Sequence, residues 1–370
     1  MRKIITHSLL FLLTLITATL TGAESMFANS FLSIENPLGW EEFWQGLQYS
    51  LPFLGILSLH KLGRYLMAQR HKIELSLPYF MPFWMPGLPI FGTLGALMRM
   101  KEAIKSRRAA FDLGVAGPML AFAATVILLT YAFSNLPPAE HIFSIHPEYQ
   151  EHGLDYAQHV YKDRGTQLLL GSNLLFEIMQ TLLVDDPKLM PPPQEMMHYP
   201  YLLAGYFACF FIALYLFPLG RMDGAHILRG LVGKDKQRTI ASIVLVGIVF
   251  YGGLGMYTLY DTMSSLIFGI PLFIFFNFYL LEKIMADKLW VLVIATAIFL
   301  IQFILGSFYE MRGFSGWLFF AFFIGRITGV HQLPTEEDAA PLSTTQQVLG
   351  WASIVIFILC FLPLPFIFKD

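Results

Sequence analysis

Nine apolar stretches along this chain constrain its fold more than any other feature. A helix needs about 20 consecutive apolar residues to cross about 30 Å of hydrocarbon. Eight stretches approach or exceed this length, and a ninth is shorter; they lie at 5–23, 47–68, 110–134, 201–218, 239–257, 262–282, 289–308, 346–366 and, the shorter one, 313–327. Of the 370 residues 56% are hydrophobic and 14% are charged, which a water-soluble globule does not accommodate. The sequence therefore predicts an all-α polytopic membrane protein with about 8–9 transmembrane helices.

The distribution of basic residues predicts how the chain is oriented in the membrane. Lysine and arginine accumulate in loops that are not translocated. With the N-terminus inside, the inner loops hold the basic clusters at 99–108 and 229–238. The outer loops hold Lys162, Arg164, Lys188 and Arg312. The net charge of −2 gives no indication of nucleic-acid binding.

The beginning of the chain allows two interpretations. We expect the stretch at 5–23 to be a retained helix, and a cleaved signal peptide is the alternative. An N-terminus without a long Arg- and Ser-rich transit peptide favours a bacterial cytoplasmic membrane over a chloroplast membrane.

The spans and loops divide the chain into five predicted segments. Residues 1–45 form a first span and an outer loop, and residues 46–134 form the first core half. An acidic exterior insertion occupies 135–200, a further span follows at 201–238, and C-terminal transmembrane helices occupy 239–370.

Four of the histidines in the exterior insertion lie close together in its first part, namely His141, His146, His152 and His159. Their spacing matches no common zinc pattern, and their surroundings are acidic and loop-like. We therefore expect solvated loop residues.

Residues 77–98 are apolar but are interrupted by Pro78, Pro82, Pro86 and Pro89. Proline removes a backbone donor and breaks helices. Basic residues flank both ends of the segment, so it is predicted to be a membrane-dipping loop that enters and leaves on one side. Backbone of this kind persists at membrane depth only where protein or a water-filled cavity satisfies its polar groups.

The second apolar stretch contains His60, Lys61 and Arg64. Ionisable groups inside a membrane are costly and usually functional. His60 and Arg64 are four residues apart and share one helical face. The alternative is that the side chains of Lys61 and Arg64 extend to the inner membrane–water interface. Asp223 follows the fourth stretch in a glycine-rich turn, where an ordinary helix-ending acid is the simpler interpretation.

Two motifs, HKLGR at 60–64 and PLGRMDGAH at 218–226, resemble the two halves of the site-2 protease active site. In that family HExxH supplies two zinc-ligating histidines and a general-base glutamate, and a later DG motif supplies an aspartate ligand. The resemblance implies a site-2 protease-like fold and a vestigial metal site of His60, Arg64 and Asp223, with Lys61 at the general-base position.

The resemblance extends over most of the chain. Similarity to the plant and cyanobacterial type, named for ethylene-dependent gravitropism deficiency and yellow-green leaves, covers 91–118, 170–183, 198–228 and 333–351.

The departures from the family pattern lie at the reactive centre. Tyr215 replaces a substrate-contacting asparagine, Arg221 replaces glutamine, and Ala225 replaces a second glycine. The resemblance implies a former substrate cavity at Tyr215, Arg221 and Gly224.

Catalytic zinc needs three protein ligands that can release a proton, and arginine cannot do so. No cofactor is expected, although the family cofactor is zinc. As a hypothesis, Lys61 or Arg64 pairs with Asp223 in place of the metal.

These observations favour a catalytically impaired pseudoprotease in the lipid bilayer that binds transmembrane protein segments or partner proteins. The alternative is an active intramembrane zinc metalloendopeptidase with an atypical ligand set of His60, Asp223 and His226. A transporter is a third possibility, which the lack of an inverted hydropathy repeat disfavours.

Overall fold

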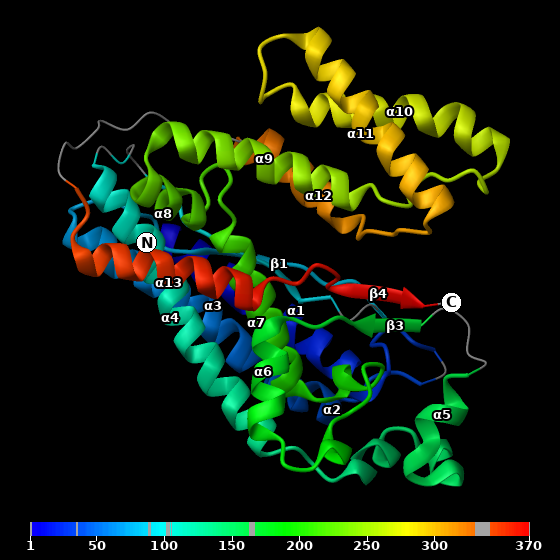
Figure 1. Ribbon diagram of the computed structural model, residues 1–370. Helices are drawn as coiled ribbons and strands as arrows, with labels where there is room; N and C mark the ends of the chain where they lie inside the picture. Colours follow the sequence, from blue (N-terminus) through cyan, green and yellow to red (C-terminus); the bar gives the residue numbers. More distant parts are fainter. Residues whose placement is uncertain are drawn as a thin grey trace. The chain divides into compact units, whose positions relative to one another are not determined.

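A computed structural model describes residues 2–34, 36–87, 90–100, 104, 106–162, 167–329 and 341–369. The chain forms two compact units, which are described separately (Figure 1). Unit 1 comprises Met1–Ile104, Val115–Tyr215 and Ala352–Asp370, and unit 2 comprises Lys105–Gly114 and Leu216–Trp351. Pro89, Lys101, Lys105, Arg164 and residues 333–340, all used in the sequence interpretation, lie outside the described residues.

Each of the nine predicted apolar stretches overlaps a helix in the structure. These helices are α1 (Arg2–Phe27), α3 (Leu47–Arg70), α4 (Arg107–Ser134), α7 (Pro200–Leu216), α9 (Lys234–Gly252), α10 (Met263–Leu281), α11 (Lys288–Phe308), α12 (Gly316–Phe323) and α13 (Thr344–Cys360). Among the described residues four helices, in α1, α4, α10 and α11, are long and apolar enough to cross a membrane, while α7, α12 and α13 are shorter apolar helices. A mostly helical membrane protein is thus confirmed, and the number of spans stays a prediction.

The expectation of an all-α chain was wrong in one respect, because two small antiparallel sheets accompany the helices. Strands β1 (Tyr79–Pro82) and β2 (Thr93–Leu97) form a hairpin within the proline-rich segment. Strands β3 (Gln167–Leu170) and β4 (Phe366–Lys369) pair near the C-terminus (Figure 1). Prolines explain both sheets, since Pro78 and Pro82 exclude a helix in the first, and Pro363 and Pro365 follow the end of α13 at Cys360 in the second.

The β1–β2 hairpin lies along most of the length of α1. Near the start of α1, His7 Nδ1 lies 3.1 Å from the carbonyl oxygen of Pro78. Near its end, Trp84 Nε1 donates to Glu24 Oε2 at 3.0 Å. The helical rise from residue 7 to residue 24 is about 25 Å, close to the hydrocarbon thickness. The segment is thus a hairpin packed along α1. Its entry into the membrane and the side of entry stay predictions.

Hydroxyl groups satisfy the backbone of the hairpin where strand pairing stops. Thr17 Oγ1 donates to the carbonyl of Gly92 at 2.8 Å, and the Tyr49 hydroxyl donates to the carbonyl of Phe91 at 2.8 Å. Gly92 has a φ of +71°, and a β-carbon there would collide with the backbone of Ala18. The close approach to α1 therefore requires glycine.

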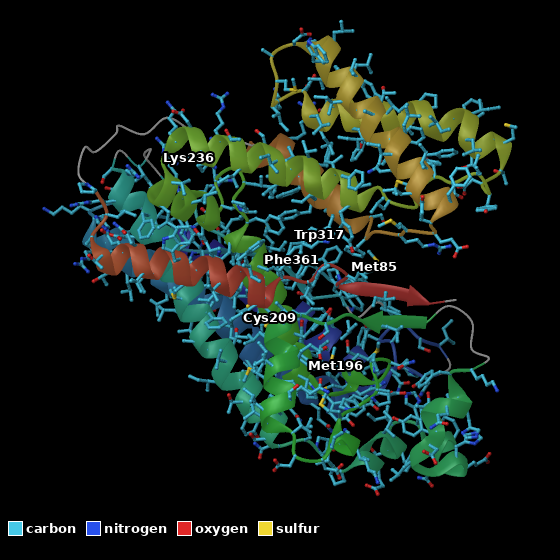
Figure 2. The ribbon with its side chains drawn as sticks, viewed as in Figure 1. Met85, Met196, Cys209, Lys236, Trp317 and Phe361 are labelled. Atoms are coloured by element: carbon cyan, nitrogen blue, oxygen red, sulfur yellow. The ribbon has the colours of Figure 1, made fainter. Side chains whose placement is uncertain are left out.

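The segment predicted to be an exterior insertion forms a series of short helices and strand β3 in unit 1. It contains η1 (Ala139–Ser144), η2 (Pro147–Asp155), α5 (Tyr156–Val160), α6 (Leu174–Leu183), η3 (Pro187–Leu189) and η4 (Met196–His198). Ile142, Tyr149 and Tyr156 form its small core. Met196, labelled in Figure 2, is buried on η4. A further short helix, α2 (Trp40–Gln45), precedes α3.

Besides the first parts of α4 and α13, unit 2 contains α8 (Asp223–Val232), α9 to α12 and a π-helical turn at Ile324–Thr328. Helices α10 and α11 pack side by side (Figure 1), and Gln302 Nε2 on α11 donates to the carbonyl of Val249 on α9 at 2.9 Å. Arg326 Nη2 donates to Glu282 Oε1 at 2.6 Å. This hydrogen bond holds the pKa of the Glu282 carboxyl below its usual value.

Candidate functional site

Helix α3 places His60 and Lys61 inside unit 1. The His60 ring is fully buried, and Lys61 is only 6% exposed. Two glycines allow α3 and α4 to approach each other closely. A β-carbon at Gly63 would lie 2.5 Å from the carbonyl oxygen of Ala116, and one at Gly117 would lie 2.9 Å from His60 Nε2. The packing of these two helices therefore fixes the position of the His60 ring.

Arg64 lies one turn beyond His60 on α3 and is partly buried. A β-carbon at Gly117 would lie 3.0 Å from Arg64 Cγ, so the stem of this side chain packs against the same part of α4. The Arg64 side chain therefore leaves α3 on the same face as His60, as the spacing of four residues predicts.

The ring of Tyr215, near the end of α7, contacts both His60 and Lys61. The His60 and Tyr215 rings stack with centroids 4.0 Å apart and an interplanar angle of 23°. Lys61 Nζ lies 4.0 Å from the centroid of the same ring. A cation over an aromatic face is attracted by the ring quadrupole, by about 2 kcal/mol or more when it is desolvated. Lys61 is thus buried over an aromatic ring.

The β1–β2 hairpin lies next to Tyr215. A β-carbon at Gly95 on β2 would lie 3.2 Å from Tyr215 Oη and 3.0 Å from Phe211 Cε1. The site in unit 1 is therefore formed by α3, α4, α7 and strand β2. We name His60, Lys61, Arg64 and Tyr215 the cationic cluster.

Unit 2 carries the DG motif. Asp223 is the first residue of α8 and is 1% exposed. A β-carbon at Gly224 would collide with the carbonyl of Leu216, which explains why glycine follows the aspartate. Arg221 is exposed, and His226 is partly buried with its Cβ 3.2 Å from the β-carbon position of Gly114.

The structure therefore brings together three predicted site residues of α3 with Tyr215 in unit 1, and Asp223 with Gly224 in unit 2. The predicted ion pair of Lys61 or Arg64 with Asp223 would join the two units and stays a prediction. Sequence reasoning missed the contact of Tyr215 with Lys61. The sequence signal for this contact was Tyr215 at a position where the family has a polar residue, together with Lys61 in an apolar stretch.

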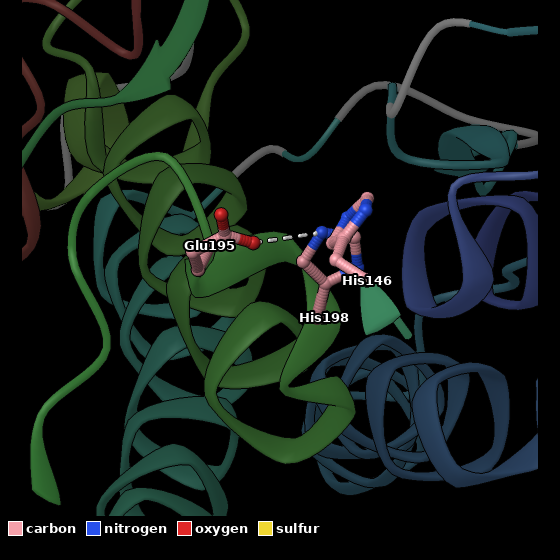
Figure 3. Close-up of side chains that lie close together, drawn as sticks. All are labelled: His146, Glu195 and His198. Carbon is pink, nitrogen blue, oxygen red and sulfur yellow. Dashed lines mark ion pairs between the residues drawn. The ribbon is translucent and has the colours of Figure 1, made fainter. Parts of the chain in front are cut away.

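Sequence reasoning also missed Glu195 and His198, which lie at the other end of α7. Together with His146 they form a cluster whose possible ligand atoms all lie within 4.8 Å of one another (Figure 3). The Glu195–His198 spacing, E-x-x-H, was readable from the sequence. The expectation of solvated histidines fits His152 and His159, which are exposed, and was wrong for His141 and His146, which are partly buried.

The apolar helices and the ionisable residues buried between helices define a polytopic helical integral membrane protein with an internal polar site. The sequence profile of Peptidase family M50 matches residues 48–259, which is more than half of the chain. This range includes both motifs of the site, and the chain belongs to Peptidase family M50.

Two curated relatives illustrate the similarity. The chain is 27% identical over 202 residues to "Probable zinc metalloprotease EGY1, chloroplastic" of Arabidopsis thaliana, covering 54% of this chain and 32% of the relative. It is 25% identical over 219 residues to "Probable zinc metalloprotease EGY2, chloroplastic" of Oryza sativa subsp. indica, covering 59% and 34%. The matches thus span about a third of each relative. No solved structure matches the chain.

Proposed function

We propose that this chain is a non-proteolytic member of the M50 family that binds transmembrane segments or partner proteins in its former substrate cavity. The observation that carries the proposal is the position of Lys61, whose ammonium lies over the Tyr215 ring where the family places its general base. A positively charged side chain cannot take a proton from water.

The donor set on α3 does not fit a catalytic zinc ion. His60 could supply one imidazole nitrogen, but its ring is stacked on Tyr215 at 4.0 Å. Arg64 stands at the second-ligand position and cannot release a proton to coordinate a metal. Lys61 and Arg64 also bring positive charge to the place where the cation would bind, which raises the cost of zinc binding.

The retained scaffold supports a binding role. The cationic cluster lies between α3, α7 and β2, and the close contact of Gly95 with Tyr215 and Phe211 keeps the hairpin beside it. Exposed Leu94 and Leu97 on β2 present apolar side chains that an apolar segment could contact. The partner class is therefore a transmembrane protein segment.

We also propose that the chain lies in a bacterial cytoplasmic membrane with its N-terminus inside.

Metal analysis and a cleavage assay on three full-length proteins test the proposal. The parent, His60→Ala and the double reversion Lys61→Glu/Arg64→His are purified and reconstituted with single-span substrates. We expect no cleavage by the parent, a metal content that His60→Ala leaves unchanged, and additional zinc bound by the reversion. Cleavage by the parent that His60→Ala abolishes, together with loss of a zinc ion, would overturn the proposal and support a metalloprotease with an atypical ligand set.

Binding is tested separately with a photoreactive amino acid in place of Leu94. We expect cross-linking to a reconstituted single-span peptide. The matched control carries the same group at Ile127, an exposed position on α4. Equal yields at both positions would contradict a binding site beside the hairpin.

A further inference from the structure

The second feature with a ligand-binding arrangement is the cluster of His146, Glu195 and His198 in the exterior insertion (Figure 3). Glu195 and His198 belong to one 3₁₀ turn that ends two residues before α7 begins. Side chains three residues apart are eclipsed on a 3₁₀ helix. The local backbone therefore directs both groups the same way, and His198 Nε2 lies 3.1 Å from Glu195 Oε2.

The hydrogen bonds of His198 determine what its second nitrogen can do. His198 Nδ1 lies 2.9 Å from the carbonyl oxygen of Met26, and because a carbonyl only accepts, Nδ1 carries the proton. In the neutral ring Nε2 then carries a lone pair, which faces Oε2 of Glu195. Two acceptors 3.1 Å apart need a proton between them, carried by the ring or by the carboxyl group, or a cation that bridges them. A histidine whose other nitrogen donates to a carbonyl has the usual orientation of a metal ligand.

Glu195 supplies an independent observation. Its side chain is 1% exposed, and its Oε1 atom is buried without a hydrogen-bond partner among the described residues. A buried carboxylate oxygen that remains unsatisfied costs about 1–3 kcal/mol or more. Coordination of a cation would remove this cost.

His146 completes the set from the start of η2. Its ring centroid lies 5.2 Å from that of His198, and its Nδ1 atom lies 3.3 Å from Glu148 Oε1, which orients the ring. His146 is only partly buried, which leaves a path for an ion to enter. Ligand atoms around tetrahedral zinc lie about 3.3 Å apart, so atoms within 4.8 Å need only a small rotation of His146.

We propose that His146, Glu195 and His198 form a zinc-binding site in the exterior insertion. Two imidazole nitrogens and one carboxylate suit Zn²⁺, and three protein ligands leave the fourth tetrahedral position for water. The ion would join η2 to η4 and, through the hydrogen bond of His198 to Met26, to the end of α1.

This site is distinct from the family motif. Helix α7 begins just after His198 and reaches Tyr215, the partner of His60, near its other end. The rise over this part of α7 is about 22 Å. Zinc bound by His146, Glu195 and His198 is therefore not evidence for proteolysis. The proposed non-proteolytic function and the proposed zinc site can each fail without the other.

Metal binding by the purified full-length protein tests the inference. After equilibration with Zn²⁺ and removal of excess ion, we expect one zinc per chain, and Co²⁺ is expected to give the visible absorption of a tetrahedral site. Glu195→Gln, which preserves shape and a hydrogen bond to His198, and His146→Ala should each weaken Zn²⁺ affinity at least tenfold. His152→Ala removes an exposed histidine of the same insertion and should leave binding unchanged.

Two results would overturn the inference. One is a parent protein that binds no Zn²⁺ at micromolar concentration. The other is zinc that Glu195→Gln and His146→Ala retain but His60→Ala removes, because the ion would then occupy the family motif.

Discussion

The contact of Lys61 with Tyr215 predicts a measurable coupling energy between two helices. Tyr215→Leu removes the ring that lies 4.0 Å from Lys61 Nζ and stacks on His60. The cation–π contribution is about 2 kcal/mol for a desolvated pair. Aromatic stacking adds about 0.5–1.5 kcal/mol. We expect Tyr215→Leu to lower the free energy of unfolding by about 2–4 kcal/mol.

Lys61→Met removes the charge but keeps an unbranched side chain. The loss of the cation–π contact is then offset because a buried ammonium no longer has to be desolvated, so this change should be nearly neutral or stabilising. In the Lys61→Met background, Tyr215→Leu loses only the stacking with His60. The double-mutant cycle should therefore give a coupling of about 2 kcal/mol between the two sites.

Equilibrium unfolding in mixed detergent micelles measures the four free energies. Tyr215→Phe is the matched control, because it keeps the ring and should keep the coupling to Lys61. A coupling below about 0.5 kcal/mol, within the usual additivity of independent sites, would refute the claim that the ring stabilises the cation.

Three further predictions concern packing and charge. Gly117→Ala should lower the free energy of unfolding by about 1–3 kcal/mol, because the new methyl group would meet α3. Gly55→Ala is the control, since a β-carbon there has open space around it, and it should change the thermal midpoint little. Equal effects of the two substitutions would contradict the close packing of α3 and α4. Glu24→Ala should speed amide hydrogen exchange in the β1–β2 hairpin. The Glu24 carboxylate accepts charge-assisted hydrogen bonds from Trp84 Nε1 and from the backbone of Phe31, each worth about 1.5–3 kcal/mol. Unchanged exchange would exclude a role of Glu24 in holding the hairpin. Glu282→Gln should lower the thermal midpoint at pH 7 but not at pH 3, because the lowered pKa of Glu282 stabilises the fold above the unfolded value of about 4.3, and this contribution disappears as the carboxyl is protonated. A loss that persists at pH 3 would refute it.

The positions of the helices were predictable from the sequence because bilayer thickness sets the length of an apolar helix. The proline-rich segment at 77–98 was predicted to be non-helical at membrane depth, but its strands were not. The pairing depends on contacts with α1, such as Trp84 with Glu24, that join residues far apart in the chain.

The candidate site was predicted only in part. The motif placed His60, Lys61 and Arg64 on one helix, and the spacing of four residues fixes the common face of His60 and Arg64. The motif could not place the Tyr215 ring over Lys61, because that contact depends on how α3 and α7 pack. The cluster of His146, Glu195 and His198 escaped detection because its three side chains come from two turns separated by about fifty residues, and only the Glu195–His198 pair has a local spacing.

The hairpin beside α1 constrains the order in which the membrane protein can assemble. Its prolines and glycines cannot satisfy their own backbone as a helix does, so the segment has no stable state alone in lipid. α1 precedes the hairpin in the chain and carries Thr17, whose hydroxyl donates to the carbonyl of Gly92. In lipid the hairpin therefore depends on its contacts with α1, and this helix is the template on which the later segment acquires its structure.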